Sequence, residues 1–421
     1  MLKHRIANNP LPVIYFTIFV DLIGFGIIIP IIPQLLANPA SEYFLLPSGQ
    51  TIQQGYVLLG LLTAIFSIMQ FLAAPILGQL SDRFGRKPVL ALSLAGTCIS
   101  YVVFALGIFT KNIPLLFLSR GFAGLTGGSI SVAQASIADV STPQNRARNF
   151  GYMGAAFGLG FILGPYIGGK MSDPSVVSWF NPTTPFIFAA ILAFINIISV
   201  FIFFPETNKF IKKAMVIKWS NSFMNIWHAA THKTLRELFL TNFLFNAGFT
   251  FFTTFFSVYL INKFHYTQGN IGDYFSYIGI WVVISQMIIT GQVAKRFSEI
   301  KTLRVSLIAA GIVIFLFFIP SSTMGLLLIT PFLAIFNGLV MANLTALISR
   351  SVEPNVQGEI MGINSSISAL AMLIPPILSG FIAAKFHPDT PIYIAGFVMV
   401  LSGVAFWTLY KSKTIIHEHV E

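Results

Sequence analysis

A single carboxylate lies deep in an apolar stretch near the start of the chain. The segment 12–37 contains Asp21 and no other charged residue, and no other acid lies as deep in a predicted span. Moving a charge into a bilayer is expensive, so an ionisable group there is a functional hypothesis by default. Because apolar surroundings favour the neutral acid, we predict that Asp21 binds and releases a proton. The alternative is a structural partner for Arg120 or a contact with a helix end.

The second embedded charge is Arg120, in the outer third of the apolar segment 113–138. A guanidinium stays charged in proteins and is costly to bury without a partner. If Arg120 lies near Asp21, it favours the ionised acid and influences when the proton leaves. The alternative is a side chain that extends to the outer membrane interface.

A run of charges separates the second apolar segment from the third, in Gly78-Gln79-Leu80-Ser81-Asp82-Arg83-Phe84-Gly85-Arg86-Lys87. Glycine permits close helix approach and tight turns, which suits Gly78 and Gly85. The four charges can pair with one another and with nearby helix ends. We predict a gate that opens and closes the inner side, formed by Gly78, Asp82, Arg83, Gly85, Arg86 and Lys87. The alternative is an ordinary positively charged loop.

Small residues dominate the fifth apolar segment, 147–170. Such residues let helices approach closely in a membrane, and proline permits a bend. The residues singled out are Gly160, Gly164, Pro165, Gly168 and Gly169. Helix packing alone is the competing interpretation.

Composition indicates what holds these residues in place. Of 421 residues, 55% are hydrophobic and 9% are charged, against about 25% charged in soluble domains. The 43 Phe exclude disorder, and the single Cys98 excludes a disulfide scaffold. Long continuous apolar runs exclude a β-barrel. We predict an all-α membrane protein with twelve spans, at 12–37, 52–80, 88–109, 113–138, 147–170, 185–205, 237–262, 270–294, 303–320, 323–349, 357–384 and 390–410.

The basic residues predict the orientation. With a cytoplasmic N-terminus, 20 of the 25 Lys and Arg fall on the inner side and Arg120 lies within a span. The outer side receives only Lys111, Lys170, Lys263 and Lys385. This asymmetry predicts that both termini are cytoplasmic. The net charge of +11 is then a property of the cytoplasmic face and does not indicate nucleic acid.

The two halves of the chain resemble each other. Residues 78–84 and 291–297 are identical at four of seven positions, and a weaker match relates Gly151, Pro165 and Gly169 to Gly362, Pro376 and Gly380. Two repeated halves are an architecture of secondary transporters. We expect a six-helix half at 1–205, a basic cytoplasmic loop at 206–236 and a second six-helix half at 237–421.

The charged run resembles the loop signature of the major facilitator superfamily. Asp21-x8-Pro30-x2-Pro33 resembles the first-span motif of proton-coupled drug exporters, and Gly164-Pro165-x2-Gly168-Gly169 resembles the fifth-span signature of antiporters. Arg120 is similar to a fourth-span arginine associated with proton transfer. The chain most resembles the tetracycline/proton antiporters. The resemblance implies proton-coupled export by alternating access, with Asp21 as proton site, Arg120 as its partner and residues 78–87 as inner gate.

One departure concerns the substrate. Tetracycline exporters carry an acid in the third span, where this chain has Ser100. Without that acid we expect poor export of a cationic magnesium–tetracycline complex. A neutral or weakly basic drug, or a secreted metabolite, is the expected substrate. Polar candidates for its cavity, each of which is alternatively an interhelical hydrogen bond, are Gln70, Gln134, Asn246, Gln286, Asn337, Asn343 and Asn364.

Other classes of function find little support. No phosphate-cradling motif indicates an ATP motor, and no metal-ligand cluster or cofactor motif is evident. We expect a non-enzymatic, monomeric protein of the bacterial inner membrane whose partners are a small molecule, protons and lipid. Two alternatives stay open, a nutrient importer or uniporter on the same fold and a non-transporting scaffold or sensor.

Overall fold

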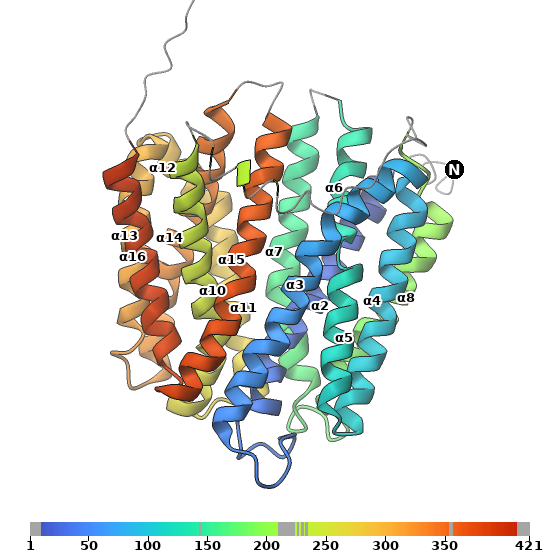
Figure 1. Cartoon of the computed structure of the whole chain (residues 1–421), viewed down its shortest axis with the longest axis vertical. Coiled ribbons are helices and arrows are strands. Elements are labelled where there is room, and N and C mark those ends of the chain that lie inside the picture. Colours follow the sequence, from blue (N-terminus) through green and yellow to red (C-terminus); the bar gives the residue numbers. More distant parts are fainter. Residues whose placement is uncertain are drawn as a thin grey trace, which may run out of the picture.

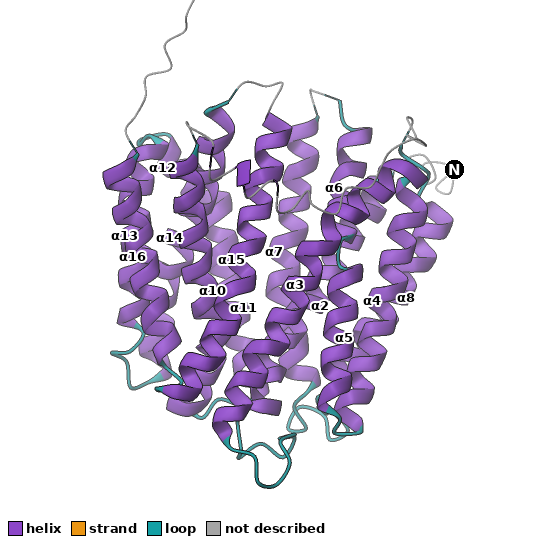
Figure 2. Cartoon of the chain, in the orientation of Figure 1, coloured by secondary structure: helices purple, strands orange, loops and turns teal. Residues whose placement is uncertain are grey.

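The computed structural model describes residues 10–142, 145–208, 224, 227–228, 231, 235–352 and 357–410. These ranges form helices joined by loops and turns (Figure 2). Most of the expected central loop, 206–236, lies outside the described residues. So do several of the basic residues used for the orientation, namely Lys3, Arg5, Lys209, Lys212, Lys213, Lys218, Lys233, Lys411 and Lys413.

The first six predicted spans form seven helices (Figure 1). These are α2 (Leu11–Leu36), α3 (Ile52–Phe84), α4 (Arg86–Phe109), α5 (Ile113–Thr126), α6 (Ser129–Val140), α7 (Arg146–Met171) and α8 (Thr184–Phe203). Pro30 and Pro33 lie inside α2, and Pro165 lies inside α7, without ending either helix.

The last six predicted spans are also helical. They are α10 (Arg236–Phe264), α11 (Gln268–Ile284) with a π-helical turn (Ser285–Ile289) and α12 (Thr290–Ala294), then α13 (Glu299–Leu316), α14 (Thr323–Arg350), α15 (Gln357–Lys385) and α16 (Thr390–Leu409). Eleven of the described spans are apolar enough to cross a membrane. The exception, α13, begins with Glu299, Lys301 and Arg304.

The fourth span, predicted at 113–138, lies at Ile113–Val140 and contains a break that the sequence analysis did not predict. It is divided at Gly127 and Gly128 into α5 and α6. A side chain at Gly128 would collide with Leu77, so glycine lets α3 press against the break. The Gln70 side chain donates a hydrogen bond of 3.0 Å to the carbonyl oxygen of Gly127. The backbone polarity released by the break is therefore satisfied inside the bundle, as a membrane requires.

The eighth span, predicted at 270–294, lies at Gln268–Ala294 and contains the π-helical turn, which was not predicted. Thr290 Oγ1 donates to the Ser285 carbonyl oxygen, five residues back, at 2.9 Å. Ser285 Oγ donates to the Ile335 carbonyl oxygen of α14 at 3.2 Å. A side chain at Gly338 would collide with Ser285. The π-helical turn thus coincides with the close contact with α14. Such turns inside α-helices are frequent at functional sites.

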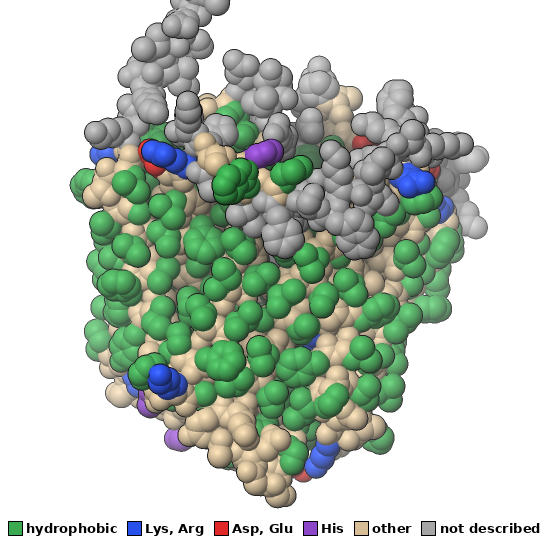
Figure 3. Space-filling view, in the orientation of Figure 1, with side chains coloured by type: hydrophobic (Ala, Val, Ile, Leu, Met, Phe, Trp, Pro, Cys, Tyr) green, Lys and Arg blue, Asp and Glu red, His purple; other side chains and the backbone are tan. Residues whose placement is uncertain are grey.

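The helix ends define two faces of the molecule. The proximal face carries the start of α2, the turn at Gly85 and the ends of α8 and α16, at the top of Figure 1. The distal face carries the loops 37–51, 110–112, 172–183, 265–267, 317–322 and 386–389. Hydrophobic side chains cover the surface between the faces, and charged side chains lie mainly toward the two ends (Figure 3). This distribution fits a bundle surrounded by lipid.

The two halves pack closely toward the distal face. The main contacts between them are α3 with α15 and α7 with α11. Any side chain at Gly60 would collide with the α15 backbone at Pro376 and Gly380. Similarly, Gly169 of α7 lies against the backbone of Gly272 of α11. Small residues therefore allow backbone-to-backbone contact between the halves.

The same helices are apart toward the proximal face. Figure 1 shows α3 and α15 diverging in that direction. A side chain added at Gly78, Gly154, Gly291 or Gly362 would meet no atom within 4 Å. These glycines belong to α3, α7, α12 and α15, of which α3, α7 and α15 make the main contacts between the halves. The described helices of the two halves thus pack closely at the distal face, and α3 and α15 separate toward the proximal face (Figure 1).

The distal contact gives a first prediction. Gly60→Leu should force α3 and α15 apart because its side chain has no space, whereas Gly78→Leu should have little effect. Spin labels at Gln53 and Phe386, in a Cys98→Ser background, report the separation. The distance between labels should lengthen only in Gly60→Leu. An unchanged distance in that variant would contradict the packing described here.

Candidate functional site

The break in the fourth span positions a partner for Asp21. Asp21 lies ten residues into α2, roughly 15 Å from its proximal end. Ser129, the first residue of α6, donates a hydrogen bond from Oγ to Asp21 Oδ2 at 2.6 Å. Asp21 therefore faces the N-terminus of a helix, where backbone dipoles favour a negative charge. This arrangement stabilises the ionised acid without placing a full positive charge beside it.

Arg120 is buried inside the first half. Only 6% of the residue is exposed, and its guanidinium carbon lies 4.2 Å from the centre of the Phe66 ring. Its Nε has no hydrogen-bond partner. This burial rules out the interfacial position offered as an alternative. Nor does an ion pair join Arg120 to Asp21, whose hydrogen bond comes from Ser129. The cation–π contact is a modest replacement for a counter-ion.

Tyr101 of α4 lies beside both charged groups. Its hydroxyl occupies the space that a side chain at Gly24 would fill, and Gly24 lies one turn after Asp21 on the same face of α2. The Tyr101 hydroxyl interacts electrostatically with both Asp21 and Arg120. The sequence analysis missed this residue. A polar aromatic in an apolar span was the available signal, but its pairing with Gly24 becomes evident only in three dimensions.

Ser100, which replaces the acid of the tetracycline exporters, is also buried. Its hydroxyl donates to the Thr97 carbonyl oxygen of its own helix at 2.7 Å. Its carbonyl oxygen accepts a hydrogen bond from Ser119, the neighbour of Arg120. Position 100 therefore joins α4 to α5 and supplies no second carboxylate to the site.

The charged run at 78–87 forms a network centred on Arg86. Arg86 Nη1 pairs with Asp82 Oδ1 at 2.7 Å, and Arg86 Nε pairs with Asp139 Oδ2 of α6 at 2.9 Å. Glu206, which follows α8, accepts hydrogen bonds from the backbone N–H groups of Arg86 and Lys87 at 2.8 and 3.1 Å. The network thus connects α3, α4, α6 and α8.

The predicted gate residues therefore bind to one another and to their own half. Gly85 has a φ of +99°, and the Glu206 carboxylate fills the space where its side chain would lie. Arg83 lies over the ring of Phe84, and Lys87 donates to the Phe201 carbonyl oxygen. Glu206 was missed in the sequence analysis. Its only signal was an acid just after the sixth span.

The fifth-span glycines form two contact surfaces on α7. Gly160, Gly164 and Gly168 face α2, where Gly164 meets the backbone of Gly26. Gly169 faces α11 in the other half, and the Pro165 carbonyl oxygen lies against Gly272. This motif places α7 between the helix that carries Asp21 and the opposite half. It can therefore link the state of α2 to the contact between halves.

The polar contacts that close the distal face form a set that we call the distal clamp. Lys170 Nζ pairs with Asp273 Oδ2 at 2.8 Å, and Thr267 Oγ1 donates to Asp173 Oδ2 at 3.3 Å. Gln34 Nε2 donates to the Tyr266 carbonyl oxygen at 3.0 Å. Each contact joins the two halves.

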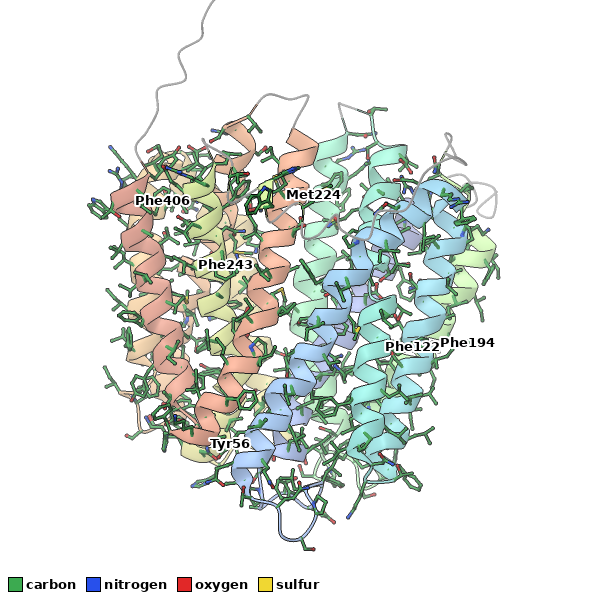
Figure 4. The ribbon with its side chains drawn as sticks, in the orientation of Figure 1. Tyr56, Phe122, Phe194, Met224, Phe243 and Phe406 are labelled. Carbon is green, nitrogen blue, oxygen red and sulfur yellow. The ribbon has the colours of Figure 1, made fainter. Side chains whose placement is uncertain are left out.

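Two further features support the distal clamp. Burial raises the pKa of Asp173, but hydrogen bonds from Ser175, Thr267 and the Gly269 backbone outweigh it and hold the pKa below its usual range. Asp173 is therefore ionised at neutral pH and accepts these bonds. Tyr56, labelled in Figure 4, makes an edge contact with Phe255 across the halves, with ring centres 6.0 Å apart.

The predicted cavity residues do not form one cluster. Gln70 binds the Gly127 carbonyl oxygen, and Asn343 donates to the Leu339 carbonyl oxygen within its own helix. Gln134 is half-buried on α6, and Gln286 is exposed on the π-helical turn. Asn337 Oδ1, by contrast, is buried without a hydrogen-bond partner.

Asn246 and Asn364 belong to a network between α10 and α15. Asn242, which the sequence analysis did not single out, donates to Asn364 Oδ1 at 2.9 Å and to Ser368 Oγ at 3.0 Å. Asn246 in turn donates to Asn242 Oδ1 at 2.7 Å. The second half thus contributes neutral amides, while the embedded charges belong to the first half. Among the described residues no group of three His, Cys, Asp or Glu is placed to hold a metal ion.

Two helical halves that meet at small residues, with ionisable groups inside the bundle, define a multi-pass membrane transporter. The chain belongs to the Major Facilitator Superfamily, whose family model matches residues 14–374 and 238–418. It is therefore a transporter and not an enzyme, as expected from the sequence.

Curated relatives span nearly the whole chain. A tetracycline resistance protein, class H, from Pasteurella multocida is 30% identical over 389 residues, which cover 89% of each chain. The quinolone resistance protein NorA from Staphylococcus aureus is 28% identical and covers 94% of this chain and 96% of that protein. The human organic anion transporter MFSD10 has the same fold, with a TM-score of 0.69 at 24% identity, covering 94% and 98% of the two chains.

The Glu206 contacts give a second prediction. Glu206→Ala should remove the acceptor at the start of α4 and lower the unfolding free energy by about 1 kcal/mol, as for loss of a helix cap. Thermal unfolding of the purified protein should show a lower Tm. Glu42→Ala, which removes an exposed distal carboxylate, is the control and should leave the Tm unchanged. Equal Tm values for both variants would mean that Glu206 does not stabilise this turn.

Proposed function

We propose that this transporter exports a small amphipathic drug or metabolite across the bacterial cytoplasmic membrane in exchange for protons. The observation that carries the proposal is the presence of a half-buried Asp21 and a buried Arg120 in the first half, in a bundle without other deeply embedded acids among the described spans. The similarity to tetracycline and quinolone resistance proteins supports export over import.

Alternating access is the proposed mechanism. If the proximal face is cytoplasmic, the structure represents the inward-open state, with the distal clamp closed. The basic residues that the structure describes support this orientation, since basic residues are in excess on the cytoplasmic side of membrane proteins. Of those near the helix ends, only Lys111, Lys170, Lys263 and Lys385 lie toward the distal face. We take the halves as 1–205 and 237–421, joined by the cytoplasmic loop 206–236, and the working unit as a monomer.

The charged run 78–87 is proposed to act as the gate of the proximal face. In the open state its charges are held within the first half by Asp139 and Glu206. Asp82 remains partly exposed, with 39% of its side chain accessible. When the proximal ends approach, this carboxylate is available to helix ends of the other half, which would stabilise the closed state.

Proton exchange at Asp21 supplies the driving force. Ser129 and the α6 N-terminus stabilise the ionised acid, whereas the apolar surroundings favour the neutral one. Because these two effects oppose each other, the protonation state of Asp21 can change when water reaches it from one side of the membrane or when substrate binds. One proton crossing 100 mV provides about 2.3 kcal/mol, which supports roughly 50-fold accumulation.

The substrate is proposed to be neutral or weakly basic. Ser100 brings no carboxylate to the site, and Asp21 must also exchange the proton. A buried cation without a dedicated partner costs several kcal/mol. The Asn242, Asn246 and Asn364 amides offer hydrogen bonds without charge. We therefore expect weak export of magnesium–tetracycline despite the resemblance to tetracycline resistance proteins.

The third prediction tests proton coupling. In everted vesicles, addition of substrate should release protons from the vesicle lumen with wild-type protein and not with Asp21→Asn, which keeps the side-chain size. The panel should include lipophilic cations, neutral drugs and tetracycline with magnesium. Glu42→Gln, in an exposed distal loop, should behave as wild type. Proton release by Asp21→Asn would remove Asp21 from the mechanism, and uptake into the cell without proton release would favour the importer or uniporter.

The fourth prediction tests the distal clamp. An exposed ion pair contributes about 0.2–1 kcal/mol, so Lys170→Asp should shift the population toward the outward-open state by up to about fivefold. Combining it with Asp273→Lys should restore the pair and the population. Accessibility of a cysteine at Val57 to an impermeant thiol reagent, in a Cys98→Ser background, is the measurement. If the cysteine at position 57 is labelled as much in the double variant as in Lys170→Asp alone, the Lys170–Asp273 pair does not hold the distal face closed.

A further inference from the structure

Three ionisable groups from three helices lie inside the first half. Asp21 belongs to α2, Tyr101 to α4 and Arg120 to α5. Tyr101 is 7% exposed and Arg120 is 6% exposed. The Tyr101 hydroxyl rests against Gly24, one turn from Asp21. The Tyr101 hydroxyl therefore lies close to the helix that carries Asp21, and no ion pair joins Asp21 to Arg120.

Among the described residues the Arg120 charge has no counter-ion. Its Nε lacks a hydrogen-bond partner there, and the guanidinium lies over the Phe66 ring. A buried cation of this kind is costly unless it stabilises negative charge nearby. The Tyr101 hydroxyl lies against Gly24, one turn from Asp21, and is within electrostatic reach of both charges. Hydrogen-bonded chains in a low dielectric polarise one another, so a hydroxyl can carry such an influence.

We propose that Tyr101 is a positioning residue that couples Arg120 to the proton site at Asp21. When Asp21 is ionised, the Tyr101 hydroxyl donates a hydrogen bond toward the carboxylate while its oxygen lies toward the guanidinium. Tyr101 keeps its own proton throughout, and the proton that leaves Asp21 passes to water. The inference rests on the proposed function, because it assigns a role within proton exchange at Asp21.

Among the described side chains, the other elements that pack on α2 place no further charged group at the depth of Asp21. From α6 the contact is Ser129, and from α8 Asn196 accepts a hydrogen bond from Thr17. Glycines of α7 face α2. The charged residues of α3, α7, α10 and α11 lie toward helix ends, at Asp82, Arg83, Arg148, Lys170, Arg236, Glu237, Lys263 and Asp273. Ser129 and Tyr101 are thus the polar groups recorded against Asp21.

The test is the pH dependence of coupled export by Tyr101→Phe. Losing a hydrogen bond to the ionised acid should move the pH of half-maximal proton release upward, by about one unit for a bond of about 1.4 kcal/mol. Substrate affinity at high pH should stay unchanged. In an Arg120→Gln background, adding Tyr101→Phe should shift the pH of half-maximal proton release by less than it does in the wild type. The reason is that Arg120 is proposed to act on Asp21 through Tyr101. Tyr43→Phe, in the distal loop 37–51, is the control.

A second variant covers the case in which Tyr101→Phe folds poorly. Gly24→Ala should displace the Tyr101 hydroxyl and move the pH midpoint in the same direction, whereas Gly154→Ala meets open space and should not. If Asp21→Asn still couples export to protons, the proposed function fails. If Asp21→Asn loses coupling while Tyr101→Phe and Gly24→Ala keep the wild-type pH midpoint, only the role of Tyr101 is overturned.

Discussion

The constraint on which the first half depends is the cost of holding Asp21 and Arg120 in a medium of low dielectric. Among the described residues neither charge has an ion-pair partner, so each is supported by neutral groups. Ser129 at a helix N-terminus supports Asp21, and the face of the Phe66 ring lies beside Arg120. That support requires the fourth span to break at Gly127 and Gly128, since a continuous helix would have no N-terminus at this depth. The break in turn requires Gln70 to satisfy its free carbonyl group.

Small residues connect this site to the movement of the halves. Helix α7 touches α2 through Gly160, Gly164 and Gly168 and touches α11 through Gly169. Because most of these contacts are between backbones, flexible side chains cannot readily absorb a small displacement of α2. Helix α7 therefore offers a physical route by which a displacement of α2 could reach the contact between the halves. The distal clamp adds weak, partly exposed pairs, which suits a contact that must open in each transport cycle.

Sequence patterns predicted the membrane spans well and the local geometry less well. Hydropathy identifies an apolar helix by its average, so the spans were correct, but a break of two residues at Gly127 and a π-helical turn at Ser285 leave that average unchanged. Asp21 was found because an isolated acid in an apolar segment is conspicuous. The contact between Tyr101 and Gly24 was missed because it joins residues far apart in sequence. Glu206 was missed because its role depends on how α8 ends beside α4.

The central claim is that Asp21 carries the proton that substrate displaces. Infrared difference spectroscopy on the purified protein in lipid, before and after substrate is added, tests this most directly. The account predicts loss of the carbonyl stretch of one protonated carboxyl group on substrate binding, with the band absent from both states of Asp21→Asn. A substrate-induced carboxyl band that persists in Asp21→Asn, or a wild-type spectrum in which no carboxyl group changes protonation, would contradict the account.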